Sequence, residues 1–171
     1  MISRLTALVC AIALTACGSA EGSSAPLVKN TMLEVWCGEH PCQWTTRGAT
    51  KKVGTWHPDD YAIELSGADS AVTQVNPDVN EQKSRCLSFS LTADIGDDAR
   101  VFLELDFLDD GAIEFTEELP KLHWGRKTFD ITPPTWYQGV RFIIRNAGPG
   151  RAVVAQLEVI NNRSYCTAPP I

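Results

Sequence analysis

Hydrophobic residues recur at every second position through much of this sequence, and this alternation limits the fold more than any other feature. It is clearest where Leu87, Phe89 and Leu91 are separated by serines. Successive side chains of a β-strand point to opposite faces, so such a segment predicts a strand with one buried face. The same pattern marks the segments 61–65, 87–95, 101–108, 140–145 and 153–159. No ten-residue segment carries an apolar stripe at helical spacing, so the sequence predicts an all-β domain.

Turn-forming residues separate the predicted strands. Asp109-Asp110-Gly111 lies between two strand-like runs, 101–108 and 112–116, and predicts a hairpin turn because glycine tolerates positive φ. Residues 146–150 are predicted to join the last two strands in the same way. The segment 56–60, Trp-His-Pro-Asp-Asp, is predicted to be a turn before the strand at Tyr61. About eight short strands in one chain predict an antiparallel β-sandwich.

The N-terminal residues predict export. A basic start at residues 1–4 precedes an apolar run over residues 5–14, which is too short to span a bilayer as a stable anchor. The run closes with Leu14-Thr15-Ala16-Cys17-Gly18, which resembles the lipobox of bacterial lipoproteins. The resemblance implies that residues 1–16 are a signal peptide and that Cys17 is acylated and becomes the first residue. The alternative is an ordinary secretory signal that leaves Cys17 as a spare thiol.

A small, polar segment follows, and residues 17–30 are predicted to be a flexible tether. Without its first 16 residues the 171-residue chain retains 155, which suits one domain over residues 31–171. Two or three acyl chains anchor a protein stably, so we expect an extracytoplasmic protein attached to the cell envelope by lipid. Gly18 is not the aspartate that retains some lipoproteins at the inner membrane. The family resemblance therefore favours the outer membrane in a Gram-negative organism.

Four further cysteines remain in the mature chain, and an even number in an exported protein predicts two disulfides. Three connectivities are possible. We prefer Cys37 with Cys42, across a turn-forming loop, and Cys86 with Cys166, between an early strand and the chain's end. The alternative is a zinc site that combines these thiols with His40, but the spacing is not that of paired Cys-x-x-Cys knuckles.

The charge balance argues against some partners. Arg4 is the only charged residue in the predicted signal peptide, so its removal changes the formal net charge from −6 to −7. A mildly acidic chain without a basic run is not expected to bind nucleic acid or to be attracted to anionic lipid.

Catalytic and metal-binding motifs are absent from the sequence. No Gly-x-Ser-x-Gly signature occurs, and His40, His57 and His123 lie in separate predicted loops without a short ligand spacing. An acidic pair such as Asp106 and Asp109 would serve a hydrolase as acid and base, but turns also require aspartate for backbone reasons. We therefore expect a protein that is not an enzyme and holds no metal or cofactor.

Tryptophan is enriched beside predicted turns. The five tryptophans are Trp36, Trp44, Trp56, Trp124 and Trp136. A ring at a loop can stack on a sugar while neighbouring polar groups bind its hydroxyls, whereas the alternative is that the rings cap the core. Trp124, Trp136 and Tyr137 flank turns, so we predict that these three residues bind ligand.

Several stretches near the C-terminus carry a family resemblance: residues 128–131, a loop with Trp136, residues 138–146 and the closing strand 153–159. Over residues 33–166 the chain resembles the galactose-binding-like jelly-roll domain of carbohydrate-binding modules. The resemblance implies an all-β antiparallel β-sandwich of the jelly-roll type. Such modules often hold a structural calcium through an acidic residue of the closing strand, but here Gln156 and Leu157 precede Glu158 without the expected aspartate. This departure argues against a structural calcium of that kind.

The sequence thus predicts a lipid-anchored, non-catalytic module that recognises glycan or another cell-surface ligand. Two alternatives remain at this stage. One is a structural or protein-binding envelope lipoprotein, in which every tryptophan belongs to the core. The other is a small hydrolase that uses the acidic pair.

Overall fold

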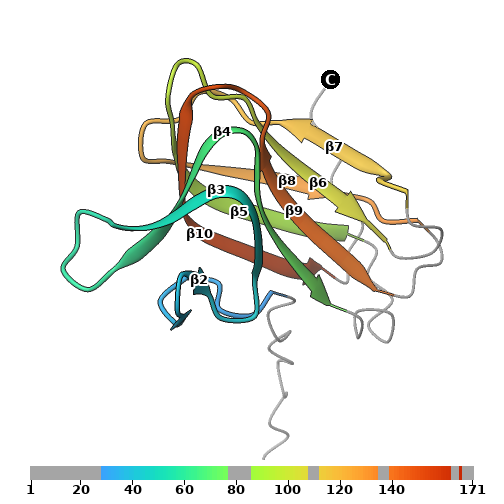
Figure 1. The fold of residues 1–171 in the computed structure, drawn as a ribbon. Helices are drawn as coiled ribbons and strands as arrows, with labels where there is room; N and C mark the ends of the chain where they lie inside the picture. Colours follow the sequence, from blue (N-terminus) through green and yellow to red (C-terminus); the bar gives the residue numbers. More distant parts are fainter. Residues whose placement is uncertain (1–27, 77–85, 108–111, 135–138, 163–165, 167–171) are drawn as a thin grey trace, which may run out of the picture.

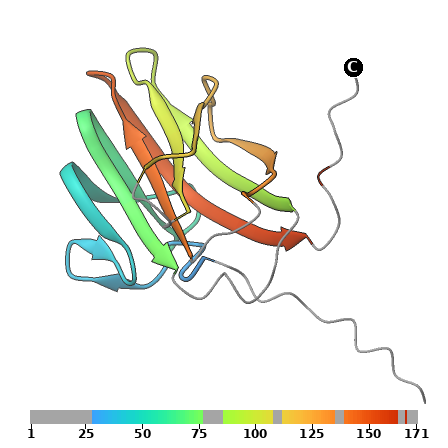
Figure 2. The same cartoon turned by 90° about the vertical axis from the view of Figure 1, so that its right-hand side faces the viewer.

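The computed structural model describes residues 28–76, 86–107, 112–134, 139–162 and 166, and this part of the chain is built from strands (Figures 1 and 2). Among these residues no helix is long and apolar enough to cross a membrane. The strands are β1 Trp36–Cys37, β2 His40–Pro41, β3 Thr45–Gly54, β4 Tyr61–Asn76, β5 Cys86–Ile95, β6 Val101–Asp106, β7 Phe115–Glu118, β8 Gly125–Ile131, β9 Val140–Asn146 and β10 Arg151–Asn162.

Eight of the strands form one continuous antiparallel sheet that bends at β3 and β4 into two layers, which we call the first and the second sheet. The first sheet has the order β8-β5-β10-β4-β3, and the second has the order β7-β6-β9-β4-β3. Residues 61–66 of β4 are in the first sheet, where β4 pairs with β10, and residues 70–76 are in the second, where it pairs with β9. The two sheets pack face to face, so the predicted jelly-roll β-sandwich is confirmed.

The two shared strands bend together at residues in the left-handed region. Gly48 of β3 and Gly67 and Asp69 of β4 have φ values of 72°, 73° and 65°. A Cβ atom at Gly48 would lie 2.9 Å from the Cα atom of Ser70, so only glycine allows the bent strands to approach this closely. Both strands therefore pass from one sheet to the other and remain paired with each other on both sides of the bend.

The alternating apolar residues face the space between the sheets. Phe89 of β5, Leu103 of β6, Phe142 of β9 and Leu157 of β10 are all buried in one hydrophobic cluster. These four strands match the predicted segments closely. β4 is longer than predicted because its alternation is interrupted where the strand bends, at residues 67–69.

The connection between β9 and β10 is not the predicted hairpin. The two strands do not pair with each other, and each pairs with β4 in a different sheet, so residues 146–150 cross the sandwich. The buried Asn146 side chain stabilises this crossing. Its Nδ2 donates to the Leu65 and Gly150 carbonyl oxygens at 3.3 and 2.8 Å, and its Oδ1 accepts from the backbone N–H groups of Arg100 and Gly148 at 3.1 and 3.0 Å. The predicted turn at 109–111 lies outside the described residues, although the flanking strands β6 and β7 pair antiparallel.

The first described residues belong to the sandwich rather than to a tether. Val28 is buried in the core, and the Lys29 N–H donates to Gln74 Oε1 at 2.8 Å. The Leu157 N–H donates to the Thr31 carbonyl oxygen at 2.9 Å, so this segment runs beside β10. The predicted tether, residues 17–30, therefore overlaps the folded part at residues 28–30.

The predicted disulfide connectivity is confirmed. Cys37 is bonded to Cys42 in the small β1–β2 hairpin, and Cys86 is bonded to Cys166, 80 positions away. The short disulfide closes a local turn, whereas the long one joins the start of β5 to the C-terminal part of the chain. A zinc site from these thiols is thereby ruled out.

Replacement of Asn146 by alanine is expected to lower the free energy of unfolding by about 2 to 4 kcal/mol, because four backbone groups lose a buried partner. Urea denaturation monitored by fluorescence measures the change. Thr116→Ala, at an exposed position of β7, is the control and should change it by less than about 0.5 kcal/mol. An equally small effect of Asn146→Ala would contradict the role given to this side chain.

The two disulfides are expected to contribute unequally to stability. Loop-closure entropy gives about 4 to 5 kcal/mol for a separation of 80 residues and about 2 kcal/mol for a separation of 5. The double serine variant at Cys86 and Cys166 should therefore denature at a clearly lower urea concentration than the double serine variant at Cys37 and Cys42. The reverse order would show that the β1–β2 hairpin holds the fold more strongly than the chain's end does.

Candidate functional site

Two tryptophans meet on the outer face of the first sheet. Ala62 of β4 and Val153 and Ala155 of β10 form a small apolar cluster on this face, and the half-buried Trp124 packs against it. Trp124 directly precedes β8 and has a φ of 48°, a conformation that is uncommon for a residue with a side chain. The small residues leave room for the indole to lie across the sheet.

Trp56 extends this aromatic surface into solvent. It lies in the loop between β3 and β4, and its ring stands edge-on to that of Trp124, with 4.9 Å between centroids and an interplanar angle of 81°. Its neighbour His57 is 5.6 Å away by the same measure. Trp56 is 60% exposed, whereas Trp44 is 2% exposed and belongs to the core. Trp124 therefore holds Trp56 in place from one side and leaves much of its surface open to a ligand.

A groove begins at Trp56 and continues along β10. It consists of two adjoining hollows of about 230 and 310 Å³, which share Met32, Thr92 and Gln156 as lining residues. We call it the aromatic groove. At the Trp56 end it is also lined by Glu34, Thr55, His57, Asp60, Tyr61 and Ala155. At the other end it is also lined by Thr31, Ser90, Arg126, Leu157 and Glu158.

Hydrogen-bonding groups line the floor of the aromatic groove. The Thr92 hydroxyl donates to Gln156 Oε1 at 3.3 Å, which leaves the Gln156 amide N–H groups without an acceptor among the described residues. At the far end Arg126 donates to Glu158 at 2.8 Å and also to the Ser90 hydroxyl. Donors and acceptors thus alternate along a surface that begins with an aromatic ring, an arrangement that suits a ligand with many hydroxyl groups.

Tyr61 at the groove's margin is positioned by Lys52. The Lys52 ammonium lies 3.4 Å from the centroid of the Tyr61 ring and 5.2 Å from that of Trp36. Trp36 is itself fixed, because its indole N–H donates to the Leu33 carbonyl oxygen at 2.6 Å. The N-terminal segment and the β3–β4 hairpin therefore meet through a cation between two rings, and this contact limits the movement of Tyr61.

The predicted ligand-binding residues have different outcomes. Trp124 lies beside the aromatic groove, where it supports Trp56, while Trp136 and Tyr137 lie outside the described residues. Trp56, predicted to lie in a turn, is the most exposed tryptophan in the described part of the chain, and it lines the groove. The sequence around Trp56 could have indicated this exposure, because the polar turn residues His57, Pro58 and Asp59 place no apolar neighbours beside the indole.

The predicted acidic pair and the histidines do not assemble a metal or catalytic centre in the described part of the chain. Asp106 is buried on the second sheet and paired with Arg141, and Asp109 is outside the described residues. His123 Nδ1 lies 3.0 Å from Asp94 Oδ1, and His40 is in β2, in the β1–β2 hairpin. Over the described ranges no group of three or more His, Cys, Asp or Glu side chains could hold a metal ion.

No protein-family model matches the chain, and no curated protein sequence matches it. Its structure is similar to that of TmCBM61, solved in complex with β-1,4-galactotriose, with a TM-score of 0.59 and 15% identity over 81% of this chain and 100% of that one. It is similar to the CBM22-1 xylan-binding domain of Xyn10C from Paenibacillus barcinonensis, with a TM-score of 0.50 and 11% identity over 80% and 94%.

The enzymatically active domain of tailspike protein 4 from bacteriophage CBA120 is also similar, with a TM-score of 0.59 and 15% identity. That match covers 78% of this chain but only 21% of the tailspike chain. Identities this low establish a shared fold, and the fold is the jelly-roll β-sandwich found in carbohydrate-binding modules.

Proposed function

We propose that this protein is a non-catalytic module that binds glycan through the aromatic groove and is held at the cell envelope by lipid on Cys17. The observation that carries the binding function is the solvent-facing indole of Trp56, supported edge-on by Trp124 at the entrance of a polar groove. A large exposed ring that is fixed in place is a surface on which the C–H face of a sugar stacks.

The shape of the aromatic groove favours an extended ligand over a compact one. Its two hollows adjoin along β10 and are open to solvent, so a chain of sugar rings fits better than a small molecule that needs enclosure. One ring would stack on Trp56. The next would reach Gln156, whose free N–H donors meet its hydroxyl oxygens, and Arg126 with Glu158 would bind a third.

The structural likenesses support the glycan class. TmCBM61 was solved with a β-1,4-galactan fragment, and the CBM22-1 domain is described as xylan-binding. Both ligands are uncharged β-linked chains with exposed hydroxyl groups. They are therefore suitable first probes for the aromatic groove.

The position of Asp106 argues against a hydrolase that uses the predicted acidic pair in the aromatic groove, which is lined by Glu34 and Asp60 at its Trp56 end and by Glu158 at its far end. A glycoside hydrolase needs two carboxyl groups on either side of the scissile bond. Asp106 is on the second sheet, away from the aromatic groove, and is paired with Arg141. Glu158, at the far end of the groove, is paired with Arg126.

The proposed lipid anchor would keep the module close to the membrane. Ten residues lie between Cys17 and Val28, where the described fold begins, and a fully extended chain over these eleven residue steps would span at most about 40 Å. Residues 31 and 32, which follow directly, line the aromatic groove. The proposed tether would therefore join the fold beside the aromatic groove.

Glycan binding is tested with β-1,4-galactan and xylan immobilised on beads, using a protein with Cys17→Ser so that lipid does not interfere. The beads should retain the protein that carries the wild-type groove. Trp56→Ala should weaken this retention about tenfold, because a stacking surface is lost. Val75→Ala removes an exposed apolar side chain from the second sheet and should leave retention unchanged. Equal unfolding free energies of the proteins exclude misfolding, and the bound glycan should be recovered uncleaved. No retention on a broad glycan panel, or full retention of Trp56→Ala, would refute the proposal.

Lipid attachment is tested by fractionation of cells that express the full chain. The wild-type protein should sediment with membranes and incorporate a labelled fatty acid. Cys17→Ser should shift the protein to the soluble fraction and abolish the label, whereas Cys37→Ser with Cys42→Ser should leave both unchanged. Membrane sedimentation of Cys17→Ser would show that the anchor lies elsewhere.

A further inference from the structure

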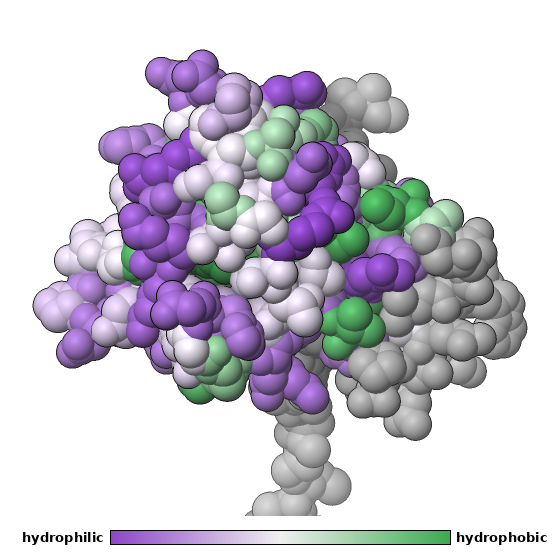
Figure 3. All heavy atoms as spheres, viewed as in Figure 1, coloured by the Kyte–Doolittle hydropathy of each residue, from purple (hydrophilic) through white to green (hydrophobic). Residues whose placement is uncertain are grey.

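Arginines gather on the outer face of the second sheet, opposite the aromatic groove. Figure 3 views this side of the molecule, where small apolar patches lie among hydrophilic ones. A groove of about 490 Å³ crosses the face, and we call it the arginine groove. It is lined by Thr45, Thr46, Arg47, Ala71, Thr73, Glu104, Ile113, Arg141, Ile143 and Arg145.

The strand register explains how the arginines are arranged. Ala71 of β4 pairs with Arg47 of β3 on one side and with Arg145 of β9 on the other. Two strand spacings therefore separate the Cα atoms of Arg47 and Arg145, about 10 Å, with only a methyl group between them. Arg141 lies four residues from Arg145 on the same face of β9, beyond Ile143. The groove is thus a shallow channel with guanidinium groups at both ends.

Two of the three arginines already hold buried carboxylates. Arg145 donates to Glu104 at 2.5 and 3.1 Å, and these hydrogen bonds raise the pKa of its guanidinium. Arg141 donates to Asp106, whose side chain is 2% exposed. Both arginines are therefore fixed in orientation before any ligand arrives.

Donors on this face nevertheless lack acceptors. The Nε of Arg141 is buried and has no hydrogen-bond partner among the described residues. Arg47 is exposed and forms no ion pair with a described carboxylate, since its Nε reaches only the Asp69 carbonyl oxygen at 3.4 Å. A buried donor without an acceptor is costly, whereas the exposed Arg47 guanidinium can pair with a ligand carboxylate without breaking an ion pair.

We propose that the arginine groove is a second binding site, which takes an acidic oligosaccharide whose sugar rings carry carboxylates. The planar guanidinium fork matches a carboxylate in two parallel hydrogen bonds, and Arg47 offers a guanidinium that is not paired with a described carboxylate. The hydroxyls of Thr45 and Thr73 lie in the row between the arginines, where sugar hydroxyls would meet them. The saccharide class of this ligand rests on the glycan-binding function proposed above.

Recognition here is directional rather than due to net charge. Glu104 and Asp106 offset two of the arginines, and Asp69 interacts electrostatically with Arg145. A densely charged polyanion gains little from such a balanced surface. An oligouronate can instead pair its carboxylates with a guanidinium group at each end of the groove. The strand positions set the distance between these guanidinium groups.

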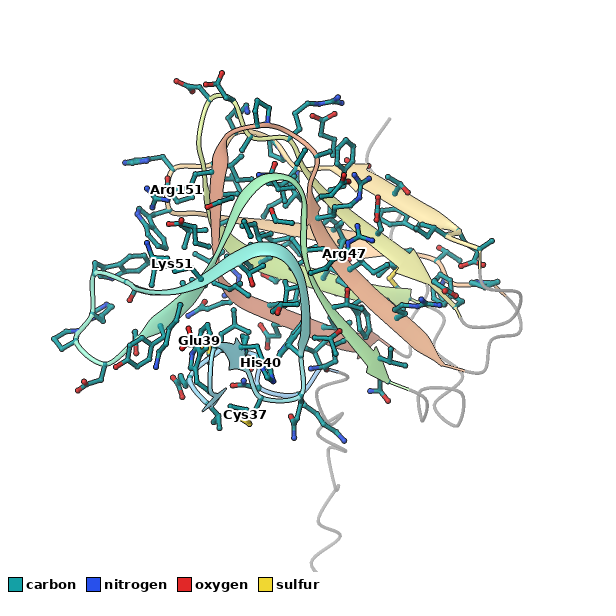
Figure 4. All side chains as sticks on the ribbon, viewed as in Figure 1. Cys37, Glu39, His40, Arg47, Lys51 and Arg151 are labelled. Atoms are coloured by element: carbon teal, nitrogen blue, oxygen red, sulfur yellow. A yellow bond between two sulfur atoms is a disulfide. The ribbon has the colours of Figure 1, made fainter. Side chains whose placement is uncertain are left out.

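The experiment measures binding of trigalacturonate by calorimetry and uses its methyl ester as the uncharged counterpart. Arg47→Gln should weaken trigalacturonate binding at least about tenfold without loss of stability, because Arg47 has no buried partner. Lys51→Gln makes the same charge change on the other arm of the bent β3, as Figure 4 shows, and should bind like the wild type. Arg141→Lys, which retains the charge facing Asp106 but not the fork, should also weaken binding. The methyl ester should bind far more weakly than the free acid to the wild type.

The outcomes separate this site from the aromatic groove. Unchanged affinity of Trp56→Ala for trigalacturonate together with loss in Arg47→Gln would support a distinct site. Failure of the wild type to bind trigalacturonate, or equal loss in Lys51→Gln, would overturn it, while Trp56-dependent retention on neutral glycan would still stand. Equal or tighter binding of triglutamate would overturn the saccharide class in favour of an acidic peptide.

Discussion

The hydrogen bonds of the buried Asn146 side chain determine how this sandwich closes. This amide joins the end of β9 to β4, to the β9–β10 connection and to the β5–β6 connection, all through backbone groups. Leu65 belongs to β4, whereas Arg100, Gly148 and Gly150 belong to the two connections that cross from one sheet to the other. Gly148 and Gly150 allow the two connections to touch, since a Cβ atom on either would lie 2.6 Å or less from backbone atoms of residues 98–100. The order of the strands on both faces follows from these crossings.

The crossings give the molecule two outer faces of different chemistry. On the first sheet, Ala62, Val153 and Ala155 are too small to cover the surface, so Trp124 lies over them and supports Trp56. On the second sheet, the equivalent space is taken by long arginine side chains whose charges are matched by buried Glu104 and Asp106. The apolar core between the sheets is the same for both faces. The difference between the faces comes from the outward positions of each strand, which the core leaves unconstrained.

Much of the fold was predictable because the alternation of apolar and polar residues shows which side of a strand is buried. It located β5, β6, β9 and β10 well, and the cysteine spacing indicated both disulfides. Alternation does not record which strand is the neighbour, so residues 146–150 looked like a hairpin although Asn146 binds across the sandwich. The candidate site was harder to predict. Trp124 and Trp56 both flank turns, and only the positive φ of Trp124 and the small residues beneath it decide which ring is supported and which is exposed.

The two bent strands make the sandwich a single mechanical unit. Most two-layer β folds are held together mainly by side chains, so one layer can separate from the other without breaking a backbone ladder. Here β3 and β4 remain paired through the bend, and the hydrogen-bond network runs without interruption from β8 to β7. One sheet therefore cannot separate from the other without breaking backbone hydrogen bonds of β3 and β4. A ligand that slows fluctuations on either face would slow amide exchange in strands that it never touches.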